Sequence, residues 1–232
     1  MTENYYLQVN DLNKNFGGIS ALSGINIEIN NNDFIGLIGP NGSGKTTLIN
    51  YISNYLRKKK IGFLKIREPG GNKNSEIIRK LILNKKSKFN AFTDLMLYFA
   101  ARSENIEKVI KKNFKKKIIL MDRFTDSTIA YQHYGMGLNK NLIENINRNL
   151  LNNIKADLVF LNIVNMNNLK KRLKLRRNKN RYDNFKINFY NKVQKGFLSI
   201  AKNKPSYVIV DSNKALEENK KKVLDKIIKL IK

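Results

Sequence analysis

The sequence predicts an α/β fold in which a parallel sheet lies between two layers of helices. Five short, mostly apolar runs alternate with longer segments of helical character, and this alternation is typical of parallel sheets with helical crossovers. The runs are apolar on both faces, as strands buried beneath helices are. Sheets of this kind bind ligands at the carboxyl ends of their strands, so functional residues are expected there.

The elements can be assigned in chain order. The predicted strands are Phe34–Ile38, Ile61–Ile66, Ile118–Met121, Leu158–Leu161 and Tyr207–Val210. Helices are predicted over residues 45–58, 75–83, 90–113, 139–151, 166–175, 183–202 and 214–231. No Pro- or Ser-rich linker interrupts them, so residues 33–232 are expected to form one domain.

Residues 1–32 differ from the rest and are expected to form a short N-terminal β extension. Tyr5–Val9 and Ile25–Ile29 are predicted strands joined by a Gly-containing loop, and Asn30–Asn32 marks a turn. Because two strands alone cannot hold a core, the extension must pack on the α/β domain or remain mobile.

Composition excludes several classes of function. The chain has 232 residues and no cysteine, which excludes disulfides, zinc clusters and thiol catalysis. Its single histidine, His133, excludes Ser-His and metal-histidine arrangements. No apolar run reaches the roughly 18 residues of a membrane span, and the polar N-terminus does not resemble a signal peptide. We expect a cytoplasmic protein whose chemistry uses Lys, Arg, carboxylates, hydroxyls and the backbone.

The net charge of +27 suggests binding to nucleic acid, but the excess of Lys over Arg argues against a dedicated nucleic-acid site. Only 10 of the 45 basic residues are Arg, whereas a strip built for phosphates would be richer in Arg and interleaved with aromatic residues. The charge is interpreted as a solvated lysine surface, with only non-specific binding to nucleic acid at low salt.

A phosphate-binding loop directly follows the first predicted parallel strand. It fits G-x-x-x-x-G-K-[ST], and a helix pattern follows it. Backbone N–H groups of the loop can surround phosphates, the lysine supplies a point charge, and the threonine hydroxyl can bind Mg²⁺. The residues predicted to bind ATP are Gly39, Pro40, Asn41, Gly42, Ser43, Gly44, Lys45, Thr46 and Thr47, with Thr46 also predicted to bind the metal.

The first fifty residues resemble the start of an ABC-transporter ATPase subunit of the branched-chain amino acid type. The matching text is VNDLNKNFGGISALSGINIEI followed by GLIGPNGSGKTTLIN. In that family an aromatic near Phe16 stacks on adenine. The resemblance stops there, because no LSGGQ-like signature follows and Arg123 stands where an ABC ATPase places its catalytic Glu. A transport ATPase subunit is therefore the alternative function, with its signature missing.

From about residue 45 to the C-terminus the chain resembles thymidylate kinase. Four motifs appear in that family's order: Arg67-Glu-Pro-Gly-Gly71; Tyr98-Phe-Ala-Ala-Arg102; Asp122-Arg-Phe-Thr-Asp-Ser-Thr-Ile-Ala-Tyr-Gln132; and Arg176, Arg177 and Arg181 before Asp183. The chain looks like a fusion at the phosphate loop that the two families share. The resemblance implies a P-loop nucleoside-monophosphate kinase that transfers the γ-phosphoryl group of ATP to dTMP, giving dTDP for DNA precursor synthesis, with Mg²⁺ and as a homodimer.

The resemblance also implies roles for individual residues. Arg123 grips the acceptor phosphate, and Asp122 orients it or helps to hold Mg²⁺. Tyr98 stacks on thymine, Arg102 donates to its O4 and Thr128 contacts the base. The remaining residues expected in the dTMP pocket are Arg67, Pro69, Tyr131, which crowds the sugar 2′ position, and Gln132.

A lid over about residues 174–184 is expected to close on ATP. By resemblance it brings Arg176, Arg177 or Arg181 to the transferring phosphoryl group, and the sequence does not decide which. The lid closure would exclude water and complete the charge clamp.

Two positions depart from the thymidylate kinase pattern. Ile38 and Asn41 stand where that family usually has acids, and Asn41 brings no charge toward the sugar 3′-hydroxyl and the metal. An inactive nucleotide-binding fusion is therefore a further alternative. On this reasoning Asn41→Asp is expected to raise dTMP phosphorylation, and Ile38→Glu to add to it if the acid reaches the metal's water shell.

Overall fold

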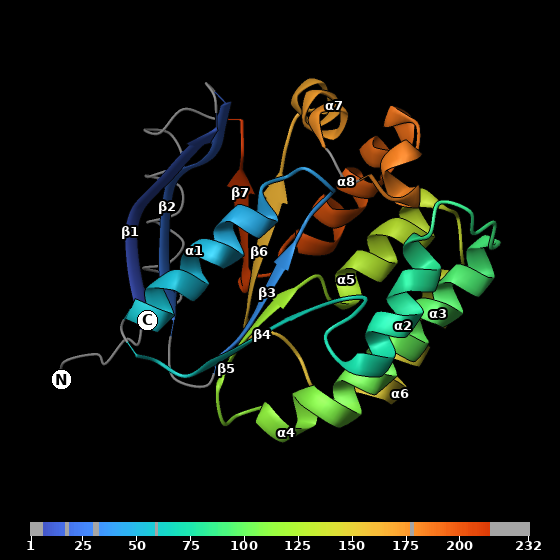
Figure 1. Cartoon of the computed structure of the whole chain (residues 1–232), viewed down its shortest axis with the longest axis horizontal. Coiled ribbons are helices and arrows are strands. Elements are labelled where there is room, and N and C mark those ends of the chain that lie inside the picture. The colour runs from blue at the N-terminus through green and yellow to red at the C-terminus, as the bar shows by residue number, and fades with distance from the viewer. Residues whose placement is uncertain (1–6, 17–18, 30–32, 59, 177–178, 214–232) are drawn as a thin grey trace.

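Five parallel strands form the central sheet of the computed structural model, in the spatial order β4-β5-β3-β6-β7 (Figure 1). The structure describes residues 7–16, 19–29, 33–58, 60–176 and 179–213. The strands are β3 (Phe34–Ile38), β4 (Phe63–Arg67), β5 (Ile118–Asp122), β6 (Leu158–Ile163) and β7 (Tyr207–Asp211). The predicted α/β fold is confirmed, and the carboxyl ends of all five strands meet at one edge.

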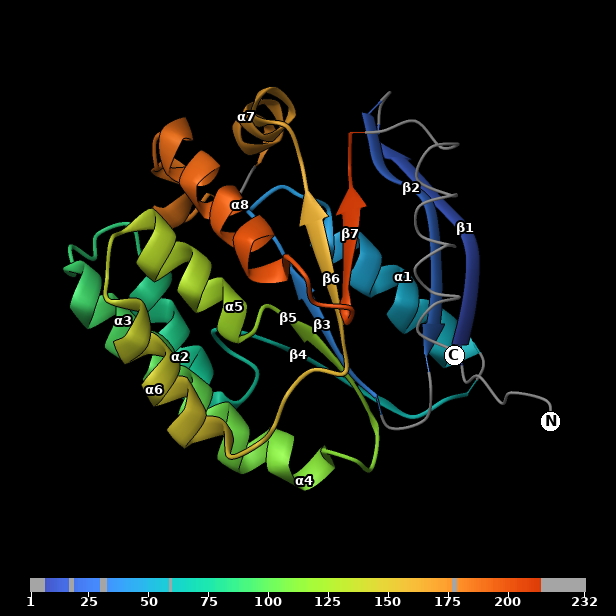
Figure 2. The ribbon, with the colours of Figure 1, turned by 180° about the vertical axis from the view of Figure 1, so that it is seen from behind.

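Helices cover both faces of this sheet, so the three predicted layers are present (Figure 2). The α-helices are α1 (Lys45–Lys58), α2 (Lys73–Leu83), α3 (Ala91–Asn105), α4 (Lys111–Asn113), α5 (Thr125–Thr128), α6 (Lys140–Leu151), α7 (Met166–Leu175) and α8 (Ile187–Ala201). Two π-helical turns, Ile106–Ile110 and Ile129–Gly135, extend α3 and α5, and Arg181–Asn184 forms a 3₁₀ turn before α8.

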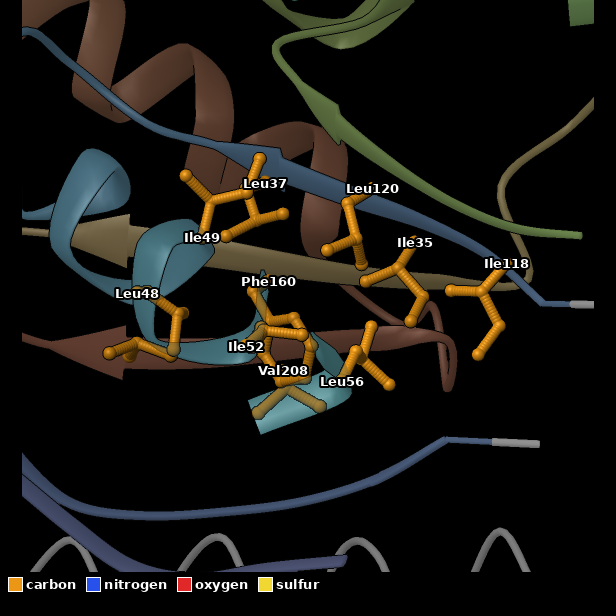
Figure 3. Close-up of a cluster of buried hydrophobic side chains, with 11 residues drawn as sticks. Ile35, Leu37, Leu48, Ile49, Ile52, Leu56, Ile118, Leu120, Phe160 and Val208 are labelled. Carbon is orange, nitrogen blue, oxygen red and sulfur yellow. The ribbon is translucent and has the colours of Figure 1, made fainter. Parts of the chain in front are cut away.

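One face of the sheet packs on α1 through a continuous apolar cluster (Figure 3). Leu48, Ile49, Ile52 and Leu56 recur at helical spacing and are almost completely buried against β3 and its neighbours. Burying one such side chain is worth about 1.5–3 kcal/mol. This packing fixes the start of α1, and with it the phosphate loop, against the end of β3.

The N-terminal extension is a two-stranded antiparallel hairpin, β1 (Leu7–Phe16) and β2 (Ile19–Ile29). It contacts α1, and β2 also contacts β7 (Figures 1 and 2). The short strands and long loop expected from the sequence are wrong, because strand pairing continues through polar residues and register shifts until Phe16 faces Ile19. Tyr5, Tyr6 and the predicted turn at residues 30–32 lie outside the described residues.

Several predicted boundaries also needed correction. The strand predicted at 61–66 is β4, shifted toward Arg67. The helix predicted over 90–113 is interrupted by a π-helical turn. The helix predicted over 183–202 starts only at Ile187, since Asn180 and Asp183 form a capping box that closes a separate turn. The helix predicted over 214–231 lies outside the described residues.

No helix within the described ranges is long and apolar enough to cross a membrane.

Candidate active site

The phosphate loop runs from the end of β3 to the start of α1. Gly39 has φ +133°, and a Cβ there would lie 2.2 Å from the backbone oxygen of Asn162, so only glycine fits. Lys45 folds back over the loop, and its Nζ donates to the oxygens of Gly39 and Pro40 at 2.9 and 2.8 Å. The loop therefore holds its lysine in place at the N-terminus of α1.

The Lys45 ammonium is buried close to other cations. Burial lowers its pKa well below the usual value, Arg123 and Arg176 lower it further, and Asp122 opposes them. An anion placed here would relieve this accumulated positive charge. The loop, the helix N-terminus and these cations together form a site for phosphate groups.

The Asp-Arg pair comes directly after β5, the strand that neighbours β3. Arg123 has φ +68°, a left-handed conformation that turns its guanidinium toward the phosphate loop. Its Nη2 donates to Asn41 Oδ1 and, at 3.3 Å, to Tyr131 Oη, and its Cζ lies 5.0 Å from the centre of the Tyr131 ring. The predicted acceptor-phosphate residue thus lies beside the phosphate loop.

A buried ion pair fixes the far end of the site. Arg102 is 2% exposed and Glu68 is 4% exposed. Arg102 Nε and Nη2 donate to Glu68 Oε2 at 2.9 and 2.7 Å. Arg102 Nη2 also donates to Thr128 Oγ1, and its Nη1 donates to Asn147 Oδ1, both at 2.7 Å.

These four bonds account for four of the five N–H groups of a guanidinium. One N–H on Nη1 has no hydrogen-bond partner among the described residues. Arg102 lines a cavity that it shares with the phosphate loop, so this N–H is the one donor of the guanidinium that the described residues leave to a ligand. The guanidinium itself is already held in one orientation.

Other buried polar atoms around Arg102 also lack partners within the described part of the chain. They are Gln132 Nε2, Ser127 Oγ and Glu68 Oε1, and all three residues line the same cavity. Burial raises the pKa of Tyr98 to about 12, although a hydrogen bond with Tyr182 and the charge of Arg123 oppose the rise. This end of the cavity combines aromatic rings with unsatisfied donors and acceptors, as a site for a polar heterocycle would.

The predicted lid arginines have different positions. Arg176 lines the cavity and donates to Asp183 Oδ1 at 2.7 Å. Arg181 does not line it, because its Nη2 binds both carboxylate oxygens of Asp94 on α3. Arg177 lies outside the described residues. Of the two described lid arginines, only Arg176 faces the site.

One cavity of about 1160 Å³ joins these features. Its volume exceeds the roughly 300–1,000 Å³ of a single small-molecule site. The predicted site residues that line it are Asn41, Gly42, Gly44, Lys45, Thr46, Thr47, Arg67, Pro69, Tyr98, Arg102, Asp122, Arg123, Thr128, Tyr131, Gln132 and Arg176. Gly39, Pro40 and Ser43 are not among the lining residues, and the oxygens of Gly39 and Pro40 hold the Lys45 ammonium.

Sequence reasoning missed several residues of the site. Arg172 on α7 lines the cavity and donates to Gly42 O at 3.0 Å. Glu68 lies within the Arg67–Gly71 motif, but no role is predicted for it from the sequence, and it is the ion-pair partner of Arg102. The available signals were the four-residue spacing of Arg172 and Arg176 and the position of Glu68 directly after a strand.

The two predicted metal ligands fit a hard cation. Asp122 Oδ1 is buried without a hydrogen-bond partner among the described residues, and Thr46 lines the same cavity. The described part of the chain holds no group of three or more His, Asp or Glu that could bind an ion by itself. Mg²⁺ commonly uses one or two protein ligands with phosphates and water, which suits this donor set.

A parallel sheet with a phosphate loop, an arginine at the next strand end and a base-sized polar pocket in the same cavity define a P-loop nucleoside-monophosphate kinase. The comparisons agree. The thymidylate kinase family model matches residues 38–223. The chain belongs to the thymidylate kinase family, whose members are phosphotransferases.

Individual relatives cover most of the chain. Thymidylate kinase of Sulfurihydrogenibium sp. (strain YO3AOP1) is 35% identical over 197 residues, 84% of this chain and 96% of the relative. That of Mycoplasma capricolum subsp. capricolum is 34% identical over 203 residues, 85% of this chain and 93% of the relative. The crystal structure of thymidylate kinase from Ehrlichia chaffeensis has a TM-score of 0.66 and 29% identity, covering 86% of this chain and 98% of that one.

Proposed function

We propose that this chain transfers the γ-phosphoryl group of ATP to dTMP. The observation that carries the proposal is the single remaining N–H of Arg102, held by Glu68, Thr128 and Asn147 in the cavity that also contains the phosphate loop. Thymine offers a carbonyl oxygen at position 4 to this donor, whereas cytosine offers an amine. Tyr98 supplies a neutral aromatic face for the ring.

The two substrates approach from opposite ends of the cavity. ATP occupies the phosphate loop, where Lys45 and the N–H groups of Gly42 and Gly44 bind its β- and γ-phosphates. Arg123 binds the dTMP phosphate, and Arg176 neutralises the charge on the transferred group. Their proximity in one cavity supports in-line transfer between the two phosphates.

Mg²⁺ would be held by Thr46 and Asp122 together with phosphate oxygens and water. The ion supplies charge neutralisation for the phosphates. The negative charge of Asp122 helps to orient the neighbouring Arg123. The protonated Lys45 supplies a positive charge to the triphosphate. Tyr131 packs under the Arg123 guanidinium and fills space at the sugar.

The chain is further proposed to be a cytoplasmic homodimer. Ile77 and Leu81 on α2 are 55% and 47% exposed, and Phe92 on the adjoining α3 is 51% exposed. Burying this apolar surface against a second copy would remove it from water. Light scattering of the wild type and of Ile77→Lys would test it, since a lysine there should shift the mass toward the monomer.

The residues before 33 are proposed to be an added β extension, of the ABC-like kind that their sequence resembles. The family match starts at residue 38, and the alignment with one relative covers 96% of that relative but only 84% of this chain. Both observations support the view that the N-terminal segment has no counterpart in the thymidylate kinase family. Binding to nucleic acid is proposed to be non-specific and confined to low salt.

A coupled ADP-release assay with dTMP, dCMP, dGMP, AMP and UMP tests the function. We expect dTMP to have the highest kcat/KM, with UMP disfavoured by Tyr131 at the sugar. Equal use of dCMP and dTMP would contradict the role of Arg102, and ATP binding without turnover of any acceptor would favour an inactive nucleotide-binding fusion.

A further inference from the structure

The side chain of Asn41 in the phosphate loop contacts two charged groups of opposite sign. Its Oδ1 accepts from Nη2 of Arg123. Its Nδ2 donates to Oδ1 of Asp183, in the lid, at 3.1 Å. The two contacts join the loop to the Asp-Arg motif on one side and to the lid on the other.

The chemistry of the partners determines the orientation of this amide. A guanidinium can only donate hydrogen bonds and a carboxylate can only accept them. The amide oxygen must therefore face Arg123, and the amide nitrogen must face Asp183. The primary amide of Asn or Gln offers both roles in one planar group, and Asn has the shorter reach.

Asp183 is placed to support the site without entering it. Its side chain is fully buried, and it is absent from the residues that line the cavity. Its Oδ1 also accepts from Arg176 Nη1 at 2.7 Å, and its Oδ2 accepts from the backbone N–H of Asn180 at 2.8 Å. Asp183 thus holds the lid turn, Arg176 and the phosphate loop together.

An acid at position 41 would disturb this arrangement. A carboxylate there could keep the contact with Arg123, but it could not donate to Asp183. Two carboxylates about 3 Å apart would instead repel each other, because like charges at that separation disfavour their ionised forms. From the sequence, Asn41→Asp is expected to raise turnover. The contacts in the structure favour the opposite result, a loss of turnover.

We propose that Asn41 and Asp183 are a pair of positioning residues that lock the lid onto the phosphate loop and so hold Arg123 and Arg176 toward the two phosphates. Arg123 and Arg176 touch the substrates, whereas the pair acts through them. The expected change in kcat rests on the proposed function, whereas the contact between Asn41 and Asp183 does not.

A double-mutant cycle with Asn41→Asp, Asp183→Asn and both together tests the proposal. Asn41→Asp should lower kcat by roughly tenfold, the factor that one charge-assisted hydrogen bond is worth. The double variant keeps the total charge of the wild type and no longer places two carboxylates side by side, although one atom at position 183 cannot both donate to position 41 and accept from Arg176. It should be at least roughly fivefold more active than the product of the two single effects predicts.

Separate measurements of kcat and KM distinguish misplaced arginines from a lid that has lost its structure as a whole. A misplaced Arg176 should lower kcat, since its charge acts on the transferred group in the transition state, and a misplaced Arg123 should raise KM for dTMP while KM for ATP stays close to wild type. A collapsed lid would raise both KM values. Asn188→Asp is a matched control, because Asn188 is exposed on α8, outside the lid, and receives the same chemical change. It should leave kcat within about twofold of wild type.

The same four proteins compared by urea unfolding give a readout that needs no activity. Non-additive stability in the cycle supports the contact even if the wild type fails to phosphorylate dTMP, in which case only the proposed function fails. Single effects that multiply within about twofold in kcat and add in unfolding free energy would overturn the proposal. A higher kcat for Asn41→Asp than for wild type would also overturn it.

Discussion

Replacing Arg102 should produce two separable losses, one in stability and one in recognition of the base. Arg102→Met keeps an unbranched apolar stem as far as the position of Nε and removes every N–H group of the side chain. It leaves Glu68 buried without its ion partner, and removing one member of a buried pair costs about 3–5 kcal/mol of unfolding free energy. It also removes the remaining Arg102 N–H that is offered to the base, worth about 1.5–3 kcal/mol, or about 10- to 150-fold in kcat/KM for dTMP.

A second substitution separates the two losses. Glu68→Gln in the Arg102→Met background removes the stranded charge, so most of the stability should return while dTMP use stays low. Urea unfolding measures the first quantity, and the coupled ADP-release assay measures the second. Arg148→Met is the matched control, because Arg148 is exposed on α6, and exposed substitutions usually change stability by no more than about 0.5 kcal/mol.

The stability loss should depend on pH in a definite direction. Burial raises the pKa of Glu68, and Arg102 opposes this rise, so removing Arg102 raises the pKa further. A carboxyl whose pKa is raised by folding favours the folded state below its unfolded pKa, and this stability is lost as pH rises through the folded pKa. Arg102→Met should therefore be closer to wild type at pH 5 than at pH 8. The reasoning is refuted if the single variant is as stable as wild type at pH 8, or if the stable double variant uses dTMP normally.

Three further outcomes are expected. Arg123→Ala should cost about 2–4 kcal/mol in kcat/KM for dTMP while ATP still binds, and full kcat/KM would remove Arg123 from the acceptor-phosphate role. Tyr98→Phe should leave dTMP use within about twofold of wild type. Because burial raises the pKa of Tyr98 to about 12, wild type should lose unfolding free energy relative to this variant between pH 10 and 12, and parallel pH profiles would count against the raised pKa. A chain starting at Asn32 should fold and bind ATP as the full chain does, as judged by calorimetry, whereas a large loss of ATP affinity would assign the hairpin to the site.

The fold was predictable because its main signals are local. Apolar runs such as Phe34–Ile38 are short and bounded by turn residues, so alternation with helices was enough to define the sheet. The hairpin was predicted too short because its pairing runs through polar residues that carry no apolar signal. The start of α8 was missed because the capping box at Asn180 depends on a side chain three residues away and closes a turn of its own.

The part of the site that consists of motif residues was predictable from the sequence. Lys45, Arg123 and Arg102 lie in one cavity because their motifs follow strand ends or face them from a helix. Glu68 and Asn147, which orient Arg102, come from segments 34 and 45 residues away. Such partners are chosen by tertiary packing, so spacing along the sequence does not reveal them.

Ile38 stands where the thymidylate kinase family usually has an acid, and its packing determines what an acid would do there. Its side chain is completely buried among Ala130, Tyr131 and Leu161, and it does not line the cavity. Ile38→Glu would remove an apolar side chain worth about 1.5–3 kcal/mol and bury an unsatisfied polar group at about 1–3 kcal/mol. We therefore expect Ile38→Glu to lose about 3 kcal/mol or more of unfolding free energy and to gain no turnover, while Ile38→Val loses only about 0.5–1.5 kcal/mol. A folded Ile38→Glu protein with faster dTMP phosphorylation would mean that the new carboxylate reaches the substrates, and that β3 can turn this residue out of the core.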